Sequence, residues 1–301
     1  MATEPARGLD LAGALGACRI PGLTAPADAL VDADVDRALA EDLGDGDLSA
    51  ALLPARSARA QIRVREDAVL CGLPWALRCF AALDPQARFE LAARDGDAVA
   101  QEQVLLTIDA DVRALVSAER CALNFLQTLS GTATVTSDYV QALAGSRSRL
   151  LDTRKTLPGL RLAQKYAVRA GGGDNHRAGL YDAVLIKENH IAAAGSIAAA
   201  VSRARELGGG RFIEVEVEDL AELEQALAAG APRIMLDEFS HQDIVRAVAI
   251  TAGRAALEVS GSMDLERMAT VAQLGVDHVS VGALTKHVRA IDLSMRLVAE
   301  G

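Results

Sequence analysis

The chain has 301 residues, of which 50% are apolar, 24% are charged and 25 are glycine, so it can bury a large core in one or two domains and is not mainly disordered. Its 41 acidic residues outnumber its 31 lysines and arginines. The net charge of -10 excludes a general attraction to nucleic acid or to an anionic membrane surface. Any anionic ligand must therefore be met by a local group of cations.

Cysteine usage and the N-terminal residues indicate the compartment. The four cysteines form no CxxC pair and have no histidine at a metal-like spacing, which is typical of a reducing setting. They are Cys18, Cys71, Cys79 and Cys121. The apolar start, Leu9 to Leu23, is interrupted by Asp10 and Arg19, unlike a secretory leader, and no other run approaches the roughly 20 apolar residues that span a bilayer. We expect a cytoplasmic protein with neither a membrane nor a nucleic-acid partner.

The first 118 residues are predicted to form a small domain of mixed helices and strands. Residues 1 to about 30 show no firm period and are expected to be a loosely held leader or a short helix. The elements predicted next are a helix at 35–43, a strand at 60–64, a helix at 73–83 and short strands at 89–91 and 104–108. A helix from about 112 to 129 has one apolar face and is expected to link this part to the rest.

After Arg149 the pattern changes to a regular alternation of strand-like and helical stretches. Short β-rich runs are found at 150–152, 183–187, 212–217, 234–237, 256–259 and 278–281. Helical stretches at 220–229, 244–250 and 265–274 separate the last four runs. Repeated βα units with right-handed crossovers predict a parallel sheet, either open or closed into a barrel.

Polar residues at the ends of these runs favour a barrel. They are Asp152-Thr153-Arg154-Lys155, Lys187, Glu216, Asp237, Ser260-Gly261 and Ser280-Val281-Gly282. One polar residue after a strand is usually part of a solvated loop, but six successive strand ends of this kind indicate a shared mouth where barrel enzymes place their chemistry. Because the strands number fewer than eight, we expect an open, irregular α/β barrel of about six or seven strands.

The distribution of cations predicts an anion site in this half of the chain. Only four of the 31 cationic residues are lysines, and three of the four lie between Lys155 and Lys187. Residues 152–190 contain seven lysines and arginines against four acids, within a chain of net charge -10. Lys187 follows an apolar run, and since a buried unpaired ammonium is costly, it is expected to have an anionic ligand or a carboxylate partner.

Other residues predict further parts of the site. The triplet Gly171–Gly173 could expose backbone N–H groups to an anion, although most such runs are plain loops. The serine and glycine residues on the last two strands occupy the position where barrels often bind phosphate. Glu216 and Asp237 could hold Mg²⁺ shared with a polyphosphate, because this cation prefers oxygen ligands. The stretch LGDGD at 43–47 lacks the closing acid of a calcium loop.

Together these segments resemble the quinolinate phosphoribosyltransferases, the decarboxylating nicotinate-nucleotide pyrophosphorylases. The matching stretches are EDLGDGDLS at 41–49, ERCALNFLQTLSGTAT at 119–134, DTRKTLPGLRLAQKYAVRAGGGDNHRAGLYDAVLIKENHI at 152–191, EVEVEDLAELEQALAAGAPRIMLD at 214–237, LEVSGS at 257–262 and GVDHVSVGALTKHVRAIDLSM at 275–295. They follow one another in order from about residue 41 to residue 295, which is far more specific than any single motif.

The resemblance implies an N-terminal α/β sandwich domain over 1–118, joined by the returning C-terminal residues 288–301, and an α/β barrel domain over 119–287. It also implies a homodimer in which Arg120 enters the partner's site. The implied reaction transfers phosphoribosyl from 5-phosphoribosyl 1-pyrophosphate to quinolinate, with loss of CO₂ and pyrophosphate, in NAD biosynthesis.

By the same resemblance, cations hold quinolinate and strand-end residues hold the phosphoribosyl donor. Arg154, His176 and Arg177 would contact the two carboxylates of quinolinate, with Lys155 and Lys187 between the two substrates. The implied catalytic residues are Lys155, Lys187, Glu216 and Asp237, of which Glu216 and Asp237 face the ribose and Mg²⁺. The other implied substrate-binding residues are Thr153, and Ser260, Gly261, Ser262, Ser280, Val281 and Gly282 around the 5-phosphate.

Two departures and two alternatives accompany this interpretation. Glu238 stands where the family usually has asparagine, and Ser262 where glycine or asparagine is common, and both adjoin the phosphoribosyl side. One alternative is a Schiff-base aldolase with Lys187 as nucleophile. The other is a non-catalytic relative that binds a phosphorylated ligand or acts in the uptake of a metal oxyanion. The presence of all the cations that would hold quinolinate argues against this second alternative.

Overall fold

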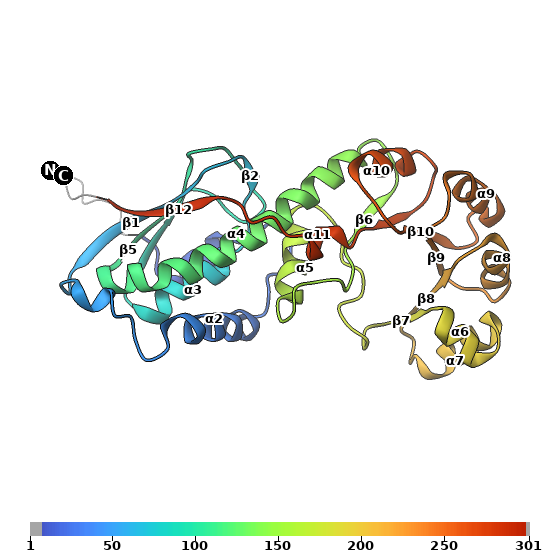
Figure 1. The fold of residues 1–301 in the computed structure, drawn as a ribbon, viewed down its shortest axis with the longest axis horizontal. Coiled ribbons are helices and arrows are strands. Elements are labelled where there is room, and N and C mark those ends of the chain that lie inside the picture. Colours follow the sequence, from blue (N-terminus) through green and yellow to red (C-terminus); the bar gives the residue numbers. More distant parts are fainter. Residues whose placement is uncertain (1–7, 299–301) are drawn as a thin grey trace. The chain divides into compact units, whose positions relative to one another are not determined.

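The computed structural model describes residues 8–298, and the chain divides into two compact units. The first unit comprises residues 8–135, 162–172 and 288–298, and the second comprises residues 136–161 and 173–287. Each unit contains its own main sheet, and the strands of both can be followed in Figure 1.

The first unit is built on a four-stranded antiparallel sheet with the order β12-β1-β5-β3. Its strands are β1 (Ser57–Val64), β3 (Arg88–Leu91), β5 (Val104–Asp111) and β12 (Leu293–Val298). Buried and more exposed residues alternate along the second half of β1, with Ile62 and Val64 in the core, as expected of a strand with one covered face. The C-terminal strand β12 pairs with β1, and Met295 lies opposite Ile62.

Helices supply the rest of the first unit's core. They are α1 (Leu11–Ala17), α2 (Asp28–Leu43), η1 (Ala50–Leu52), α3 (Leu73–Leu83), the first part of α4 (Val112–Ala142) and α5 (Arg161–Ala170), with a short ladder of β2 (Ala68–Val69) and β4 (Ala98–Val99). Helix α3 begins after Gly72, whose φ is +112°, and carries Pro74 in its first turn, where the missing N–H costs nothing. Trp75 of α3 is fully buried against the rings of Phe125 and Tyr166.

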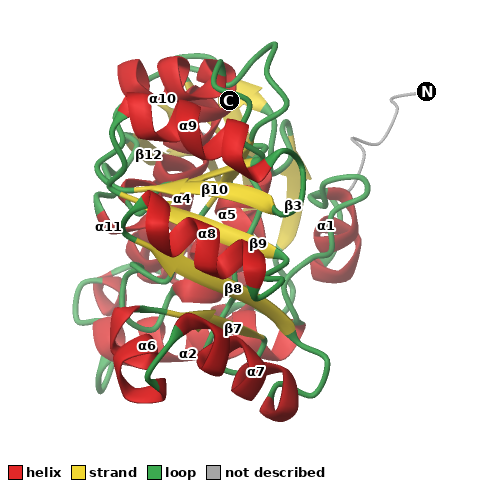
Figure 2. Cartoon of the chain, turned by 90° about the vertical axis from the view of Figure 1, so that its right-hand side faces the viewer, coloured by secondary structure: helices red, strands yellow, loops and turns green. Residues whose placement is uncertain are grey.

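The second unit is built on a six-stranded parallel sheet with the order β6-β11-β10-β9-β8-β7. Its strands are β6 (Arg149–Leu151), β7 (Ala183–Ile186), β8 (Phe212–Val217), β9 (Arg233–Asp237), β10 (Ala256–Ser260) and β11 (His278–Ser280). Strands β6 and β7 form its two edges, so the barrel is open, and the outer side of β6 has only a single bridge to Asp174. Figure 2 shows α8 and α9 in front of β8, β9 and β10.

Several helices of the second unit begin with a side-chain cap. The helices are α6 (Glu188–Ala194), α7 (Ile197–Leu207), α8 (Leu220–Ala228), α9 (His241–Thr251), α10 (Leu265–Ala272) and α11 (Ala283–Lys286). Asp219, Ser240 and Asp264 accept hydrogen bonds from the third backbone N–H of α8, α9 and α10, which fixes where each loop turns into a helix. The ends of β8, β9 and β10 are therefore followed by short, well-defined loops.

The predicted fold class is confirmed, with several local differences. The helix predicted at 112–129 runs on to Ala142, and among residues 8–298 no seventh strand joins the parallel sheet. The first unit extends beyond the predicted boundary after residue 118, because the early turns of α4 pack in its core. Within the predicted leader, residues 11–17 form the short helix α1, while residues 1–7 lie outside the described residues.

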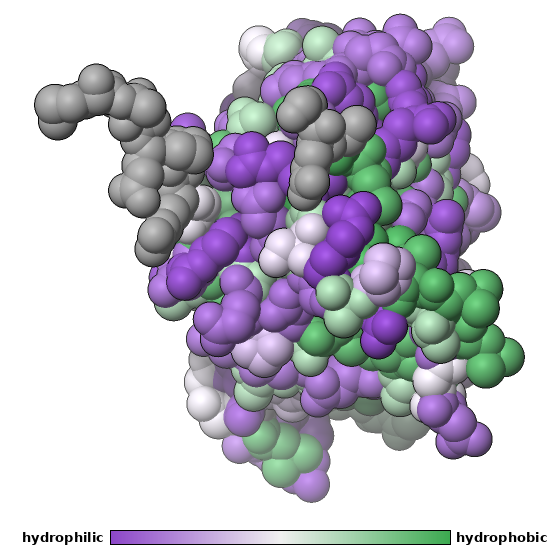
Figure 3. Space-filling view, turned by 90° about the vertical axis from the view of Figure 1, so that its left-hand side faces the viewer, coloured by the Kyte–Doolittle hydropathy of each residue, from purple (hydrophilic) through white to green (hydrophobic). Residues whose placement is uncertain are grey.

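The surface of the first unit agrees with the acidic, highly charged composition. Its face in Figure 3 is largely hydrophilic, with a smaller band of apolar residues. No helix within residues 8–298 is both long enough and apolar enough to span a membrane.

Candidate active site

The polar strand ends predicted from the sequence lie along one edge of the parallel sheet. Asp237, the last residue of β9, lies opposite Ser260, the last residue of β10, and Ser280 at the end of β11 lies opposite Leu151 of β6. Because parallel strands have their carboxyl ends on the same side, the residues that follow them gather at one mouth. The second unit thus brings together the predicted residues Thr153 to Lys155, His176, Arg177, Lys187, Glu216, Asp237, Ser260 to Ser262 and Ser280 to Gly282.

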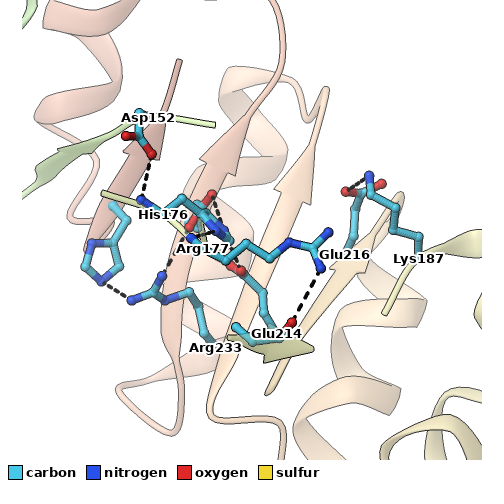
Figure 4. Close-up of polar contacts among 10 residues, drawn as sticks. Asp152, His176, Arg177, Lys187, Glu214, Glu216 and Arg233 are labelled. Atoms are coloured by element: carbon cyan, nitrogen blue, oxygen red, sulfur yellow. Dashed lines mark hydrogen bonds and ion pairs between the residues drawn. The ribbon is translucent and has the colours of Figure 1, made fainter. Parts of the chain in front are cut away.

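Asp152 holds the two loops that carry the arginines. Its carboxylate is fully buried and accepts hydrogen bonds from the His176 backbone N–H at 2.8 Å and from the Asn175 side chain at 2.6 Å. The Arg161 guanidinium, in turn, donates to the backbone carbonyl of Arg154 and to that of Ala178. Residues 152–156 and 174–178 are therefore fixed against each other before any ligand binds, as Figure 4 shows for Asp152 and His176.

Arg154 and Arg177 form a cationic pair at the mouth. Burial and, next, the positive charge of Arg154 lower the pKa of the Arg177 guanidinium below its usual value. Among residues 8–298 the buried Nε of Arg154 has no hydrogen-bond partner. Two neighbouring cations that lose hydration, one of them with an unused donor, are stabilised by an anion with more than one oxygen. This pair is suited to a dicarboxylate.

Lys187 has the carboxylate partner that the sequence predicts. Its Nζ donates to Glu216 Oε2 at 2.5 Å, and the two side chains come from neighbouring strand ends (Figure 4). The expectation of a buried ammonium is wrong, because 41% of the Lys187 side chain is exposed. The exposed part faces solvent, so Lys187 can meet a second anion while Glu216 holds it.

Lys155 lies over a glycine on the last strand loop. A Cβ on Gly282 would stand 2.9 Å from Lys155 Cδ and 3.4 Å from Thr153 Oγ1, so only glycine leaves room for this side chain. The Lys155 backbone is fixed from both sides, since its N–H donates to Thr153 Oγ1 and its carbonyl accepts from Thr285 Oγ1. The Lys155 side chain therefore packs directly against Gly282.

A buried polar cluster beneath the mouth escaped prediction. His176 Nε2 lies 2.8 Å from Glu214 Oε2 and 3.7 Å from Glu258 Oε1, and both carboxylates are almost fully buried. Arg233 lies 3.5 Å from Glu258, and its other Nη donates to His278 Nε2 at 3.2 Å. Figure 4 shows His176, Glu214 and Arg233 converging inside the sheet.

The charges of this cluster compensate one another. Burial raises the pKa of Glu214 and of Glu258, and for Glu258 the charge of Glu214 raises it further. Burial, followed by the charge of Arg233, lowers the pKa of His278 to about 4, which keeps His278 neutral and able to accept from Arg233. His176, Glu214 and Glu258 have donor atoms within 4.8 Å, as in a metal site, but Arg233 already supplies positive charge here, so we assign no ion.

His176 links this cluster to Arg177. Its Nδ1 accepts the Arg177 backbone N–H at 2.7 Å, while its Nε2 contacts Glu214. With Nδ1 accepting, the proton of a neutral ring sits on Nε2 and is donated to the carboxylate. A direct contact between His176 and a ligand would require one of these bonds to open.

Several residues singled out from the sequence lie outside the second unit. Arg120 is exposed on α4 in the first unit, and Lys165 and Arg169 lie on α5, also in the first unit. The glycine triplet does not form an anion cradle as expected, because the N–H groups of Gly171 and Gly172 bond to carbonyls at the end of α5. No helix was predicted over 161–170, where the cations were interpreted only as part of an anion site.

Comparison with known proteins identifies the family. The chain matches the family models "Quinolinate phosphoribosyl transferase, N-terminal domain" over residues 47–130 and "C-terminal domain" over residues 132–296. It is 40% identical over 257 residues to a probable nicotinate-nucleotide pyrophosphorylase (carboxylating) of Bacillus subtilis, covering 85% of this chain and 89% of that protein. It is 42% identical to the nicotinate-nucleotide pyrophosphorylase (carboxylating) of Mycobacterium leprae, covering 87% and 95%.

Solved structures agree with these matches. The nicotinate-nucleotide pyrophosphorylase of Francisella tularensis superposes with a TM-score of 0.90 at 46% identity, covering 93% of this chain and all of that one. The corresponding protein of Ehrlichia chaffeensis gives a TM-score of 0.84 at 35% identity, covering 88% of this chain and 97% of that one. The chain therefore belongs to the quinolinate phosphoribosyl transferase family.

Proposed function

We propose that the mouth of the second unit joins quinolinate to 5-phosphoribosyl 1-pyrophosphate. The ring nitrogen attacks C1 of the sugar, pyrophosphate leaves, and the 2-carboxylate is then lost as CO₂ to give nicotinate mononucleotide. The observation that carries this assignment is the gathering of Arg154, Arg177 and Lys187 at one end of the parallel sheet in a chain of net charge -10, where the charge of Arg154 lowers the pKa of the Arg177 guanidinium. The chain is a phosphoribosyltransferase of NAD biosynthesis, as its relatives are named.

Arg154 and Arg177 bind the two carboxylates of quinolinate. Bidentate hydrogen bonds from a planar guanidinium fix the plane of the pyridine ring, which aims its nitrogen in line with the departing group. The buried cluster beneath keeps Arg177 in this orientation, because Glu214 holds His176 and His176 holds the backbone of Arg177. His176 thereby contributes to quinolinate binding chiefly through Arg177.

Lys155 and Lys187 lie between the two substrates, and Glu216 and Asp237 face the sugar. Lysine is a compact cation that can follow the charge developing on a departing pyrophosphate. The carboxylates stabilise the positive charge that grows on the sugar ring as its bond to pyrophosphate breaks. Thr153 and the serine and glycine residues of the last two strand loops, 260–262 and 280–282, take the 5-phosphate through backbone N–H and hydroxyl groups.

Glu216 and Asp237 would also hold Mg²⁺. Two carboxylates at neighbouring strand ends offer the hard oxygen ligands this cation prefers, and one oxygen of Glu216 already serves Lys187, so the ion would take its remaining ligands from water and pyrophosphate. When bound, Mg²⁺ neutralises charge on the leaving pyrophosphate.

No covalent nucleophile is required for this reaction, and the environment of Lys187 agrees. A lysine that forms a Schiff base must lose its proton in a desolvated pocket, whereas Lys187 is partly exposed and donates to Glu216. After the sugar is attached, the pyridinium charge stabilises the carbanion left by decarboxylation. The protein therefore acts by orientation and by fixed charge.

The active form is a homodimer in which Arg120 reaches the partner's site. Support comes from the exposure of Arg120 on α4, and from Leu48 and Leu52, whose large apolar surfaces are more than four-fifths exposed in the same unit. Mixed dimers of Arg120→Ala and Lys187→Ala chains should regain about one working site each, since Lys187 of the first chain and Arg120 of the second then complete one shared site. If exchange of subunits is verified and no activity returns, Arg120 does not cross.

The decisive experiment follows CO₂ released from quinolinate labelled in its 2-carboxylate. Release should require both 5-phosphoribosyl 1-pyrophosphate and Mg²⁺, and pyrophosphate should appear in equal amount. Arg177→Ala should raise the KM for quinolinate by about 30-fold or more, the loss typical of a buried charged contact, with a much smaller change for the donor. Absence of CO₂ release, or trapping of a carbonyl substrate by borohydride, would refute this function.

The compartment remains a prediction from cysteine usage. All four cysteines are buried as free thiols, and burial raises the pKa of each of them, which suits a reducing cytoplasm where thiols are structural.

A further inference from the structure

Glu238 occupies an unusual place at the mouth. It is the first residue after β9, and its φ of +52° lies in the left-handed region that a residue with a Cβ rarely adopts. Its backbone N–H continues the sheet by donating to the Ser260 carbonyl at 3.1 Å. The Glu238 side chain therefore extends from a fixed strand end in a strained backbone conformation.

The Glu238 carboxylate lies on the loop that the proposed function gives to the 5-phosphate. Oε1 accepts the Ser262 backbone N–H at 2.9 Å and lies 3.4 Å from Ser262 Oγ. A Cβ on Gly261, whose φ is +136°, would stand only 2.7 Å from Glu238 Oε2. The carboxylate therefore fills the space that the glycine leaves open and uses the N–H group that this space exposes.

Arg267 lies beside the same carboxylate and gives it a second possible partner. Its guanidinium donates to the carbonyls of Ser262 and Phe239, which ties the loops after β9 and β10 together, and Nη1 is 3.7 Å from Glu238 Oε2. A backbone N–H over a glycine, with a guanidinium nearby, is an arrangement that binds anions. In this chain the anion is part of the protein, and 57% of its side chain is exposed, so no packed side chain blocks its displacement from the Ser262 N–H.

We propose that Glu238 is an internal competitor for the 5-phosphate of the phosphoribosyl donor. In the unliganded chain its carboxylate takes the Ser262 N–H, and the donor gains this group only when Glu238 moves away towards Arg267. Glu238 and Ser262, the two positions at which the sequence departs from its family resemblance, are thus hydrogen-bonded partners that together lower donor affinity. This inference rests on the proposed function.

The test compares Glu238→Gln and Glu238→Ala with the unaltered chain by titration calorimetry. Ribose 5-phosphate and pyrophosphate, the two ends of the donor, serve as separate probes, in the presence of Mg²⁺. Both variants should bind ribose 5-phosphate about tenfold more tightly, the scale of removing one like charge at contact distance near a protein surface, while pyrophosphate and quinolinate change less than twofold. The KM for the complete donor should fall in parallel.

The matched control is Glu224→Gln, which removes the same charge from an exposed position on α8 and should alter neither probe. Equal or weaker binding of ribose 5-phosphate by both Glu238 variants would overturn the proposal, and so would tightening confined to pyrophosphate. These outcomes are distinguishable from failure of the proposed function. If the proposed function is wrong, the unaltered chain itself will release no CO₂ from quinolinate when supplied with the donor.

Discussion

The two units of this chain bury very different interiors. Among residues 8–298 the fully buried aromatic side chains, Trp75, Phe80 and Phe89, all belong to the first unit, while both units bury aliphatic side chains such as Leu105 and Leu236. The second unit instead buries Glu214 and Glu258 against His176 and Arg233 inside its sheet. An apolar interior stabilises the fold, whereas buried ion pairs seldom do so, since desolvation offsets their attraction. The contrast indicates that the second unit keeps buried polar groups for the chemistry at its mouth, whereas the aromatic core of the first unit contributes chiefly to stability.

The largest expected effect is on the stability of the first unit. Trp75→Ala should lower the free energy of unfolding by about 3–5 kcal/mol, because it removes a fully buried ring and leaves Asp34 Oδ2 without the indole N–H that it accepts at 3.0 Å. Denaturant unfolding measures this loss. The kcat of the folded fraction should stay unchanged, and Leu207→Ala, which truncates an exposed residue, should cost little. A fall in kcat with full stability would contradict the division of roles.

Lys187→Ala should lower kcat and leave the stability of the fold unchanged, the opposite of Trp75→Ala. Loss of one cation that stabilises the transition state, with Glu216 left unpaired, should reduce kcat by about 100- to 1,000-fold while the unfolding transition hardly moves. Steady-state kinetics alongside thermal unfolding give both values. The reference is Arg246→Ala, which breaks an exposed ion pair with Asp243 on α9 and should leave both unchanged. A comparable loss of kcat in Arg246→Ala would contradict a specific role of Lys187 in stabilising the transition state.

Glu258→Gln tests whether the buried cluster acts through His176 and Arg177. Removing the carboxylate charge leaves Arg233 less compensated and frees His176 to shift, so the KM for quinolinate should rise about tenfold while the KM for the donor changes less than twofold. Initial rates at varied quinolinate and donor separate the two constants. Tyr139→Phe removes a buried hydrogen bond to the Met263 carbonyl in the same unit and should change neither KM. Equal shifts for both substrates would show a general loss of packing instead.

The smallest expected effect concerns the one strongly shifted carboxyl of the first unit. Burial raises the pKa of Asp95 to about 7, from about 3.9 in an unfolded chain. The folded state therefore holds a proton that the unfolded state has lost, so this contribution to stability is complete below about pH 4 and disappears as the pH rises through 7. Between pH 6 and pH 8 the free energy of unfolding should fall by about 1 kcal/mol from this group.

Asp95→Asn should remove that part of the pH dependence. The amide oxygen can still accept from the Leu73 N–H, and the Tyr166 hydroxyl can turn to accept from the amide, so the local hydrogen bonds survive. Unfolding by urea at pH 6 and at pH 8 measures the difference, with the exposed Glu206→Gln as reference. An unchanged slope in Asp95→Asn would assign the pH dependence to other groups.

The strand ends were predictable, whereas the polar interior was not. Lys187, Glu216 and Asp237 interrupt apolar runs at the point where each strand ends, and this local pattern is sufficient to place them at one mouth. Glu214 lies within a strand and alternates with apolar residues, a pattern that predicts that its side chain faces solvent. Only the closure of several strands around a common interior turns that side inward.

Contacts between segments far apart in the sequence could not be predicted from local patterns either. Residues 161–170 carry three cations and received no helix prediction, yet they form α5, with Ala163, Ala167 and Val168 buried. The pairing of β12 with β1 joins segments more than 200 residues apart, and no periodicity in either segment specifies its partner. Here only the family resemblance pointed to the returning C-terminal segment.

That pairing bears on how the protein is made. Because β12 follows β1 by more than 200 residues, for much of synthesis one whole side of β1 has backbone donors and acceptors without their final partner, although β5 has long since emerged. An unpaired strand edge of this kind recruits other chains, and pairing between such distant segments is intrinsically slow. The nascent chain therefore passes through an association-prone state that lasts until β12 has been made, and a truncation just before Leu293 would make that state permanent.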